Sequence, residues 1–194
     1  MPATTLVKSV ALAGAGTLGS VILPELVKAG FETTVLTRRD SKRDSPFLSA
    51  KAAKEAGVKL FVPGEFGNPT TNIEQAEVHP IMYGKKQIQD LLKSVGLPTL
   101  LVFNGPFSDT TFNAFLGFDA ATGRIRLVGK GDTPISWTTR LDVARFLAHY
   151  LSTLTSFPSA SESAVLRIEG DRKTYSEVVD IYCRLQPDQN VQVS

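Results

Sequence analysis

Three glycines with a recurrent spacing are the first residues of this chain that could do chemistry. Gly14, Gly16 and Gly19 form the pattern G-x-G-x-x-G between an apolar segment and a segment with helical periodicity. In such a turn the first glycine allows a tight bend, the second lets the backbone approach a pyrophosphate, and the third lets helix and strand pack closely. The free N–H groups at the start of the helix then face the phosphates. The pattern predicts a dinucleotide-binding turn made of Gly14, Ala15, Gly16, Thr17, Leu18 and Gly19.

The residues after the second predicted strand bear on which dinucleotide is bound. Arg38 follows the glycines by about 20 residues, where an acidic residue holds a ribose 2′-hydroxyl and an arginine accommodates a 2′-phosphate. Arg38 therefore favours NADP(H) as the cofactor. Asp40 keeps NAD(H) open as the less favoured cofactor, and a solvated run of charges in a loop is a further alternative.

The elements that must position this turn follow from the apolar periodicity. Predicted strands alternate with predicted helices, which indicates an α/β fold with a Rossmann-like, mostly parallel sheet flanked by helices. The expected strands span residues 7–13, 31–36, 58–62, 99–103 and 164–168. The expected helices span residues 17–29, 47–56, 83–95, 139–151 and 175–185.

Local signals add detail near the C-terminus. Thr174 is expected to cap the last helix, with Glu177 completing a capping box. Segments 124–128 and 134–137 flank a glycine-rich turn and predict a hairpin. The tail after Pro187 is polar and is expected to be frayed.

A strand–helix–strand unit is missing from this pattern. A doubly wound sheet has such a unit, of roughly 30 residues or more, after its second strand. Here only residues 38–46 separate that strand from the next predicted helix. The sheet is therefore expected to be incomplete, so that the first strand either keeps an exposed edge or pairs directly with residues 58–62.

Composition excludes several classes of protein. The chain has 194 residues, 42% of them hydrophobic and 21% charged, as expected for one soluble globular domain. A net charge of +2 is too small to indicate a nucleic-acid partner, and no apolar run approaches the length of a membrane helix. A single cysteine, Cys183, excludes an internal disulfide and fits a cytoplasmic location. With two histidines besides, no typical zinc site is expected, and no oligomeric state is indicated.

Hydrolytic chemistry is not expected either. The chain has no G-x-S-x-G motif, and neither His79 nor His149 has an evident serine and aspartate arrangement. Glu65 and Asp142 could form a catalytic pair of carboxylates. We instead interpret Glu65 as a residue that structures its loop and Asp142 as a first-turn complement to a helix dipole.

Four stretches together resemble the NmrA-like and isoflavone-reductase-like family: residues 14–19, 35–38, 53–67 and 96–99. The resemblance extends to about Val179. It implies an atypical short-chain dehydrogenase with a Rossmann core, forming one domain over residues 1–194. Residues 104–138 and 155–194 would contribute a small C-terminal substrate-binding part.

The same resemblance implies a function. The expected activity is NADPH-dependent reduction of an aromatic or otherwise unsaturated small molecule. Some members of the family are dinucleotide-sensing regulators without turnover, so a non-catalytic regulator is the alternative, and an inactive truncated relative is a third outcome.

A catalytic lysine also follows from the resemblance. Counting back from Pro98, the family's lysine corresponds to Lys85, which would act as general base or proton donor near the nicotinamide. The neighbouring Lys86 is either the cation that lowers the pKa of Lys85 or the true match. Tyr83 does not begin a Y-x-x-x-K pair, because Gln87 stands four residues on. A solvated lysine on an exposed helix is the alternative.

Three departures from the family pattern are visible. The strand–helix–strand unit is absent, Gly64 stands where the family has serine before Glu-Phe-Gly, and the chain ends soon after its last predicted helix. They predict a shortened or alternatively spliced relative, or an incorrect gene model.

Overall fold

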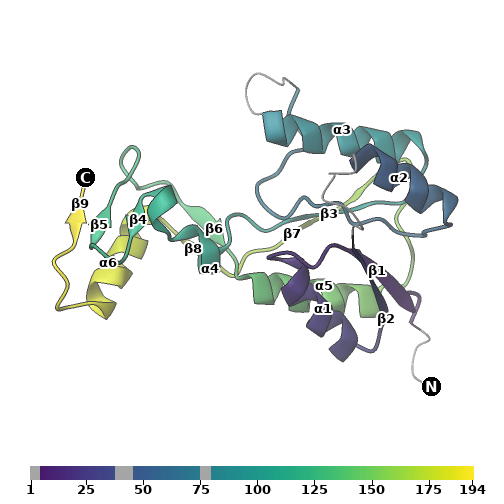
Figure 1. The fold of residues 1–194 in the computed structure, drawn as a ribbon. Helices are drawn as coiled ribbons and strands as arrows, with labels where there is room; N and C mark the ends of the chain where they lie inside the picture. The colour runs from purple at the N-terminus through teal and green to yellow at the C-terminus, as the bar shows by residue number, and fades with distance from the viewer. Residues whose placement is uncertain (1–4, 38–45, 75–79) are drawn as a thin grey trace.

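The computed structural model describes residues 5–37, 46–74 and 80–194 (Figure 1). Its strands are β1 (Ser9–Ala13), β2 (Glu32–Leu36), β3 (Leu100–Phe103), β4 (Phe118–Asp119), β5 (Arg124–Ile125), β6 (Ile135–Trp137), β7 (Ala164–Arg167), β8 (Asp171–Lys173) and β9 (Gln192–Val193). Its helices are α1 (Gly19–Lys28), α2 (Pro46–Glu55), α3 (Pro80–Ser94), α4 (Ser108–Thr111), the 3₁₀ turn η1 (Ala114–Leu116), α5 (Arg140–Thr153) and α6 (Tyr175–Leu185).

The N-terminal unit is the β-α-β unit that the sequence predicts. β1 and β2 pair in parallel from Ser9 opposite Glu32 to Ala13 opposite Leu36. Helix α1 connects them and ends before Gly30, which has a φ of +87°. Glycine suits this position because only it adopts a left-handed conformation without a Cβ penalty.

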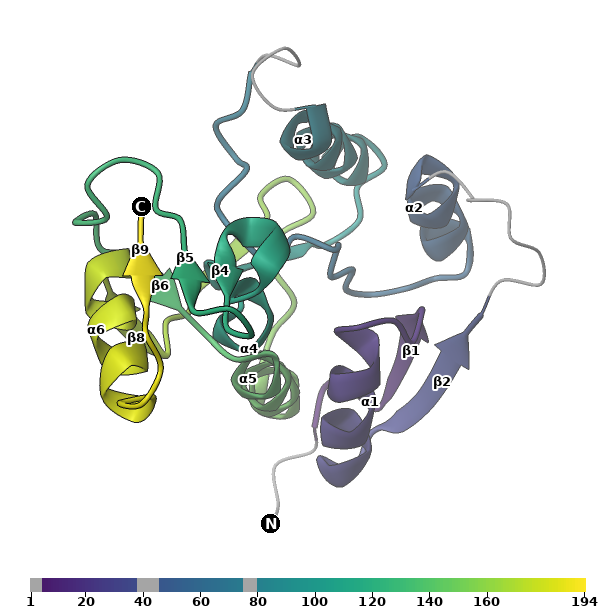
Figure 2. The same cartoon turned by 60° about the vertical axis from the view of Figure 1, so that its left-hand side comes forward.

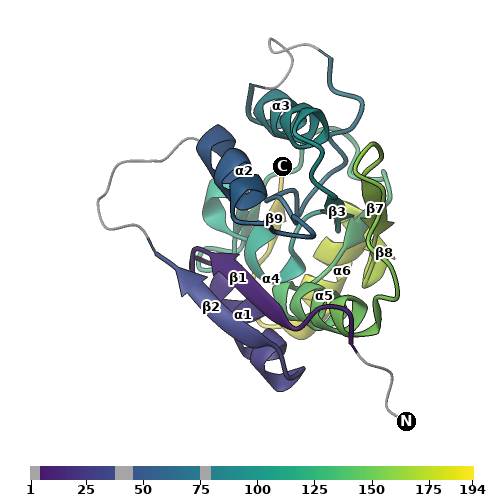
Figure 3. The same cartoon turned by 90° about the vertical axis from the view of Figure 1, so that its right-hand side faces the viewer.

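The centre of the molecule has three layers. β3 and β7 pair in parallel, with α2 and α3 on one side and α5 and α1 on the other (Figures 1 and 3). The predicted strand over residues 58–62 is reduced to a single parallel bridge between Phe61 and Thr99. Two main-chain hydrogen bonds make this bridge, from the Phe61 N–H to the Pro98 oxygen at 2.8 Å and from the Leu100 N–H to the Phe61 oxygen at 2.9 Å.

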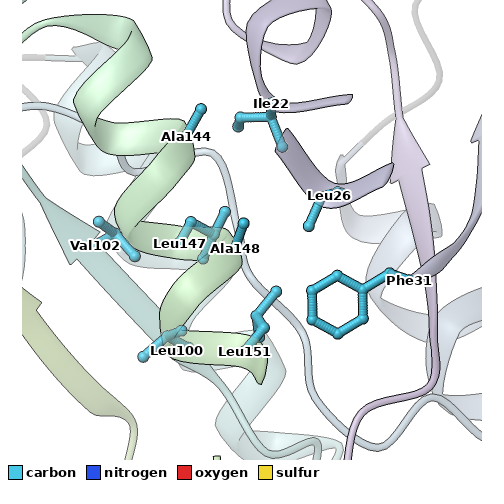
Figure 4. Close-up of a cluster of buried hydrophobic side chains, with 9 residues drawn as sticks. All are labelled: Ile22, Leu26, Phe31, Leu100, Val102, Ala144, Leu147, Ala148 and Leu151. Atoms are coloured by element: carbon cyan, nitrogen blue, oxygen red, sulfur yellow. The ribbon is translucent and has the colours of Figure 1, made fainter. Parts of the chain in front are cut away.

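The main hydrophobic core joins α1 and α5 to one face of β3 (Figure 4). Its leucine, isoleucine, valine and phenylalanine side chains contribute about 1.5–3 kcal/mol each when fully buried. The cluster consists of Ile22, Leu26, Phe31, Leu100, Val102, Ala144, Leu147, Ala148 and Leu151. A second cluster of Ala50, Leu92 and Leu97 packs α2 against α3, and the partly buried Val58 and Phe61 pack against it.

The sheet is incomplete, as expected. The β1–β2 pair and the β3–β7 pair are separate sheets, and no strand in the described residues joins them. Among the described residues β1 pairs with β2 alone, so the main-chain groups along its other edge have no strand partner there. Of the two expectations for β1, the exposed edge is confirmed and direct pairing with residues 58–62 is wrong, because Phe61 pairs with Thr99 instead.

The C-terminal elements gather at one end of the molecule, around α6 (Figure 2). Phe118, Ile125 and Val179 form the buried centre of this part. The capping box of Thr174 and Glu177 is confirmed. The structure describes no helix that is long and apolar enough to cross a bilayer.

Two local expectations fail here. Segments 124–128 and 134–137 do not form a hairpin: β5 pairs with β4 and β9, whereas β6 pairs with β8. The tail is not frayed, because β9 pairs in parallel with β5. In both cases pairing with a segment distant in sequence decides the outcome: β6 pairs with β8, and β5 pairs with β9.

Candidate functional site

The glycine turn connects β1 to α1 and depends on two of its glycines for different reasons. Gly14 has a φ of +94°, which places it in the left-handed region. Its N–H donates to the carbonyl of Leu36 at 3.0 Å. A Cβ at Gly19 would lie 2.2 Å from the main-chain oxygen of Gly14, so only glycine allows the helix to start so close to the turn.

The middle glycine faces open space. A Cβ at Gly16 would meet no atom within 4 Å. Leu18, at the N-cap of α1, provides no side-chain hydrogen bond to the helix start. A helix N-terminus without a side-chain cap, beside an unfilled space, fits an anion such as a pyrophosphate.

Arg140, at the start of α5, contacts this turn. Its guanidinium donates from Nη1 to the main-chain oxygen of Thr17 at 3.2 Å and from Nε to Asp109 Oδ2 at 2.7 Å. Burial alone would raise the pKa of Asp109, but the hydrogen bonds and charge of Arg140 outweigh it and hold that pKa below its ordinary value. Asp109 therefore stays ionised and keeps a cation beside the glycine turn.

Lys85 lies half-buried in the second turn of α3. Its Nζ donates to the main-chain oxygen of Glu65 at 2.5 Å. Burial lowers the pKa of Lys85, and the negative charge of Glu65 partly offsets that shift. The amine is therefore closer to its neutral form at physiological pH than an exposed lysine is.

The neighbouring lysine, Lys86, has an ionic partner of its own. Lys86 forms an i,i+4 ion pair with Asp90, whose side chain is 62% exposed. Burial is what lowers the pKa of Lys85, and the charge that acts on it is that of Glu65. Of the two roles expected of Lys86, that of a cation that lowers this pKa is not supported, and that of the family's lysine stays a prediction.

Glu65 lies in the loop that follows the Phe61 bridge and is 1% exposed. Thr70 Oγ1 donates to Glu65 Oε2 at 2.6 Å, and Gln89 Nε2 donates to Glu65 Oε1 at 2.8 Å. The same Gln89 amide donates to Thr70 Oγ1 at 2.7 Å. Lys85 and Gln89 are four residues apart, so one face of α3 bears both.

A series of hydrogen bonds runs between the lysine and the glycine turn. From the loop of Glu65, the main-chain oxygen of Gly67 accepts from the N–H groups of Asn104 and Gly105. The main-chain oxygen of Asn104 accepts from Thr138 Oγ1 at 2.8 Å, and Thr138 stands two residues before Arg140. The carboxyl end of β3 therefore lies between the loop that holds Lys85 and the segment that reaches the glycine turn. Ligands of open α/β sheets bind at this edge.

Asn104 has an unmatched polar atom at this edge. The residue is fully buried, and its Nδ2 donates to the oxygen of Gly105 at 2.8 Å. Among the described residues, Asn104 Oδ1 is the buried side-chain atom that has no hydrogen-bond partner. An unsatisfied buried acceptor costs about 1–3 kcal/mol, and such groups often belong to functional sites.

The other predicted residues are distributed as follows. Arg38, Asp40 and His79 lie outside the described residues. His149 is exposed on α5. Asp142 Oδ2 accepts from Oγ1 of Thr139, the N-cap residue of the same helix. Glu65 and Asp142 have separate partners, so they do not form a carboxylate pair. The described part of the chain has no cluster of residues that could hold a metal ion.

Comparison with models of protein families shows which family the chain belongs to. The model of the NmrA-like family matches residues 48–188. The chain belongs to the NmrA-like family. The match begins after the glycine turn, at α2, and includes Glu65, Lys85 and Arg140.

Solved structures share the fold of this NmrA-like chain. AtPrR2, solved with NADP+ and (+)-pinoresinol, has a TM-score of 0.79 at 17% identity, covering 97% of this chain and 78% of its own. An isoflavone reductase has a TM-score of 0.76 at 17% identity, with the same coverage of 97% and 78%. Leucoanthocyanidin reductase from Vitis vinifera, in a binary complex with NADPH, has a TM-score of 0.73 at 15% identity and covers 95% and 76%. The incomplete Rossmann-like α/β fold is thereby confirmed.

A curated relative carries a named activity. The oxidoreductase aprR of Aspergillus flavus is 33% identical over 96 residues, which is 47% of this chain and 32% of the relative. This NmrA-like chain therefore matches about a third of the length of that oxidoreductase.

Three polar residues of the site have no motif in the sequence that marks them. Thr70 and Asn104 lie in irregular segments, and Arg140 reaches Thr17 across 123 positions of the chain. A weak signal exists for Gln89, because it stands one helical turn after Lys85. The roles of Gln89, Asn104 and Arg140 depend on contacts with residues 19 or more positions away.

Proposed function

We propose that this chain is an NADPH-dependent reductase of an aromatic or otherwise unsaturated small molecule. One observation carries the proposal. A half-buried lysine with a lowered pKa and a dinucleotide-type glycine turn are linked by hydrogen bonds and short main-chain segments that pass the carboxyl end of β3. A redox cofactor and a proton-transferring group are both needed for reduction of a carbonyl or polarised double bond.

NADP(H) is the cofactor that these residues favour. The turn from Gly14 to Gly19 fits a pyrophosphate, because Gly16 leaves the necessary space and α1 lacks a side-chain cap. Solved relatives of the same fold carry NADP+ or NADPH. Arg38 would neutralise the 2′-phosphate.

The chain's own residues would bind NADPH and the substrate, orient them and protonate the substrate. Bound NADPH would supply a hydride, and Lys85 would donate a proton to the atom that gains negative charge. The Glu65 main-chain oxygen would keep the ammonium in place during this transfer. Residues 104–138 and 155–194 would hold the substrate, and the single cysteine favours a cytoplasmic location.

Arg38 tests the choice of cofactor. The wild-type protein is expected to bind NADPH more tightly than NADH, and Arg38→Ala should reduce that preference by about tenfold or more, because it removes a charge-assisted contact to the phosphate. Isothermal titration calorimetry with both cofactors measures the preference, and Arg39→Ala is the matched control. Equal affinity of the wild type for both cofactors would contradict the assignment.

Arg140 tests the role of the cation beside the turn. Arg140→Ala is expected to weaken NADPH binding roughly fivefold to tenfold, because the turn loses its hydrogen bond at Thr17 and a nearby positive charge. Arg145→Ala, on the same helix and 59% exposed, should bind NADPH like the wild type. A similar loss in both variants would mean that the site responds only to overall charge.

A non-catalytic dinucleotide-binding regulator is the second candidate. The unpaired edge of β1 favours it, because the strand that would complete the sheet beside the glycine turn is not present in the described residues. A panel of aromatic and unsaturated carbonyl substrates with NADPH separates the two functions. NADPH binding without turnover would favour the regulator, and absence of both would indicate an inactive relative.

A further inference from the structure

The Glu65 cluster is buried beside a lysine with a proposed role in proton transfer. The cluster consists of the Glu65 carboxylate, the Thr70 hydroxyl and the Gln89 amide. Its two donors are neutral, so they stabilise the carboxylate without cancelling its charge. Isolated carboxylates are seldom buried, because removing a charge from water costs several kcal/mol.

The negative charge of the Glu65 cluster acts on Lys85. Among the described residues, Glu65 is the group whose charge raises the pKa of Lys85, against the effect of burial. On α3 itself, Lys86 is paired with Asp90, and Gln89 is neutral. Glu65 therefore contacts Lys85 through its main-chain oxygen and acts on it through its side-chain charge.

We propose that Glu65 is the positioning residue of Lys85: its main-chain oxygen holds the ammonium, and its clamped carboxylate keeps Lys85 charged over the pH range in which it donates a proton. The catalytic part of this proposal rests on the proposed reductase function. Thr70 and Gln89 hold the carboxylate in one orientation by donating to its two oxygens.

Glu65→Gln removes the charge but keeps the main-chain oxygen and almost the same side-chain shape. Without the opposite charge, the protonated form of Lys85 is less stable, so the pKa of Lys85 should fall by about one pH unit. The high-pH limb of the rate profile should move to lower pH by the same amount. The KM for NADPH should change little, because the glycine turn is untouched.

Competitive labelling with acetic anhydride measures the Lys85 midpoint without turnover or cofactor. Mass spectrometry follows acetylation against pH, and the exposed Lys93 on the same helix is an internal reference. Thr70→Val is the matched control, since it removes the two hydrogen bonds of the Thr70 hydroxyl from the cluster and keeps the Glu65 charge. Its Lys85 midpoint should move much less than that of Glu65→Gln. Circular dichroism checks that each variant folds.

The results separate the two proposals. An unchanged Lys85 midpoint in Glu65→Gln, or an equal shift in Thr70→Val, would overturn the role of Glu65. If Glu65→Gln does not fold, Glu65→Asp withdraws the carboxylate by one methylene and should give a smaller downward shift; no shift in that variant would also overturn it. A shifted midpoint together with normal turnover in Lys85→Ala would retain the electrostatic link and refute the reductase mechanism.

Discussion

Lys85→Ala is expected to lower kcat for NADPH-dependent reduction by about 10²–10⁴-fold, the usual contribution of a positioned proton donor. The amine is half-buried and held by the main-chain oxygen of Glu65, so alanine removes the proton source and its hydrogen bond. NADPH affinity should stay close to that of the wild type, because Lys85 has no contact with the glycine turn among the interactions described. Steady-state kinetics and calorimetry on the same preparations measure both quantities.

Two control variants separate charge from proton transfer. Lys85→Arg keeps a cation beside Glu65 but does not release its proton in the working pH range, so its kcat should remain low. Lys86→Ala removes an exposed ion pair and should retain wild-type activity. Loss of activity in Lys86→Ala with full activity in Lys85→Ala would make Lys86 the family's lysine instead.

The pH dependence has a defined direction. A protonated Lys85 donates to the substrate, so the rate should fall as pH rises through the pKa of Lys85. Burial lowers that pKa, so the fall should occur below the range of about 10.4 typical of exposed lysines. A rate that rises with pH across the same range would assign Lys85 as a general base.

Gly19→Ala should primarily lower stability and Gly16→Ala should primarily lower NADPH affinity, although both add one methyl group to the same turn. At Gly19 the new Cβ would lie 2.2 Å from the main-chain oxygen of Gly14, so the turn or α1 must shift. Overpacking of this kind costs about 1–3 kcal/mol, which exceeds the gain of up to about 1 kcal/mol from replacing a helical glycine with alanine. Thermal unfolding should show a clear loss of stability.

At Gly16 the same methyl group meets no protein atom within 4 Å and needs no change of conformation. Stability should therefore be unchanged within about 0.5 kcal/mol. The methyl group would occupy the space through which a pyrophosphate approaches the backbone, so NADPH affinity should fall by about tenfold or more. Wild-type NADPH affinity in Gly16→Ala would show that the dinucleotide does not lie on this turn, and increased stability in Gly19→Ala would contradict the close approach of α1 to Gly14.

Much of the local structure could be predicted from residues close together in the chain. The β-α-β unit follows from the apolar periodicity around the glycines, and Gly30 ends α1 as expected. The capping box of Thr174 and Glu177 also follows from a local spacing. Each of these features is decided by contacts within a few residues or within one supersecondary unit.

Strand pairing could not be predicted in the same way. The glycine-rich turn near residue 130 favours a hairpin, yet β6 pairs with β8 and β5 pairs with β9. β-structure depends on which partners are available and on the burial they provide, and those partners stand far away in sequence. The same reason explains why residues 58–62 contribute only the bridge from Phe61 to Thr99.

The sequence by itself determined the glycine turn, its strand and helix, and the lysine that the family pattern marks. The tertiary structure decided what surrounds them: Arg140 at Thr17, the Glu65 cluster at Lys85, and the hydrogen bonds through Asn104 between the two. The turn is specified by steric requirements within six residues, which the letters of the sequence express directly. The charge state of Lys85 depends on burial and on a carboxylate 20 residues away, which exist only once α3 has packed against its loop.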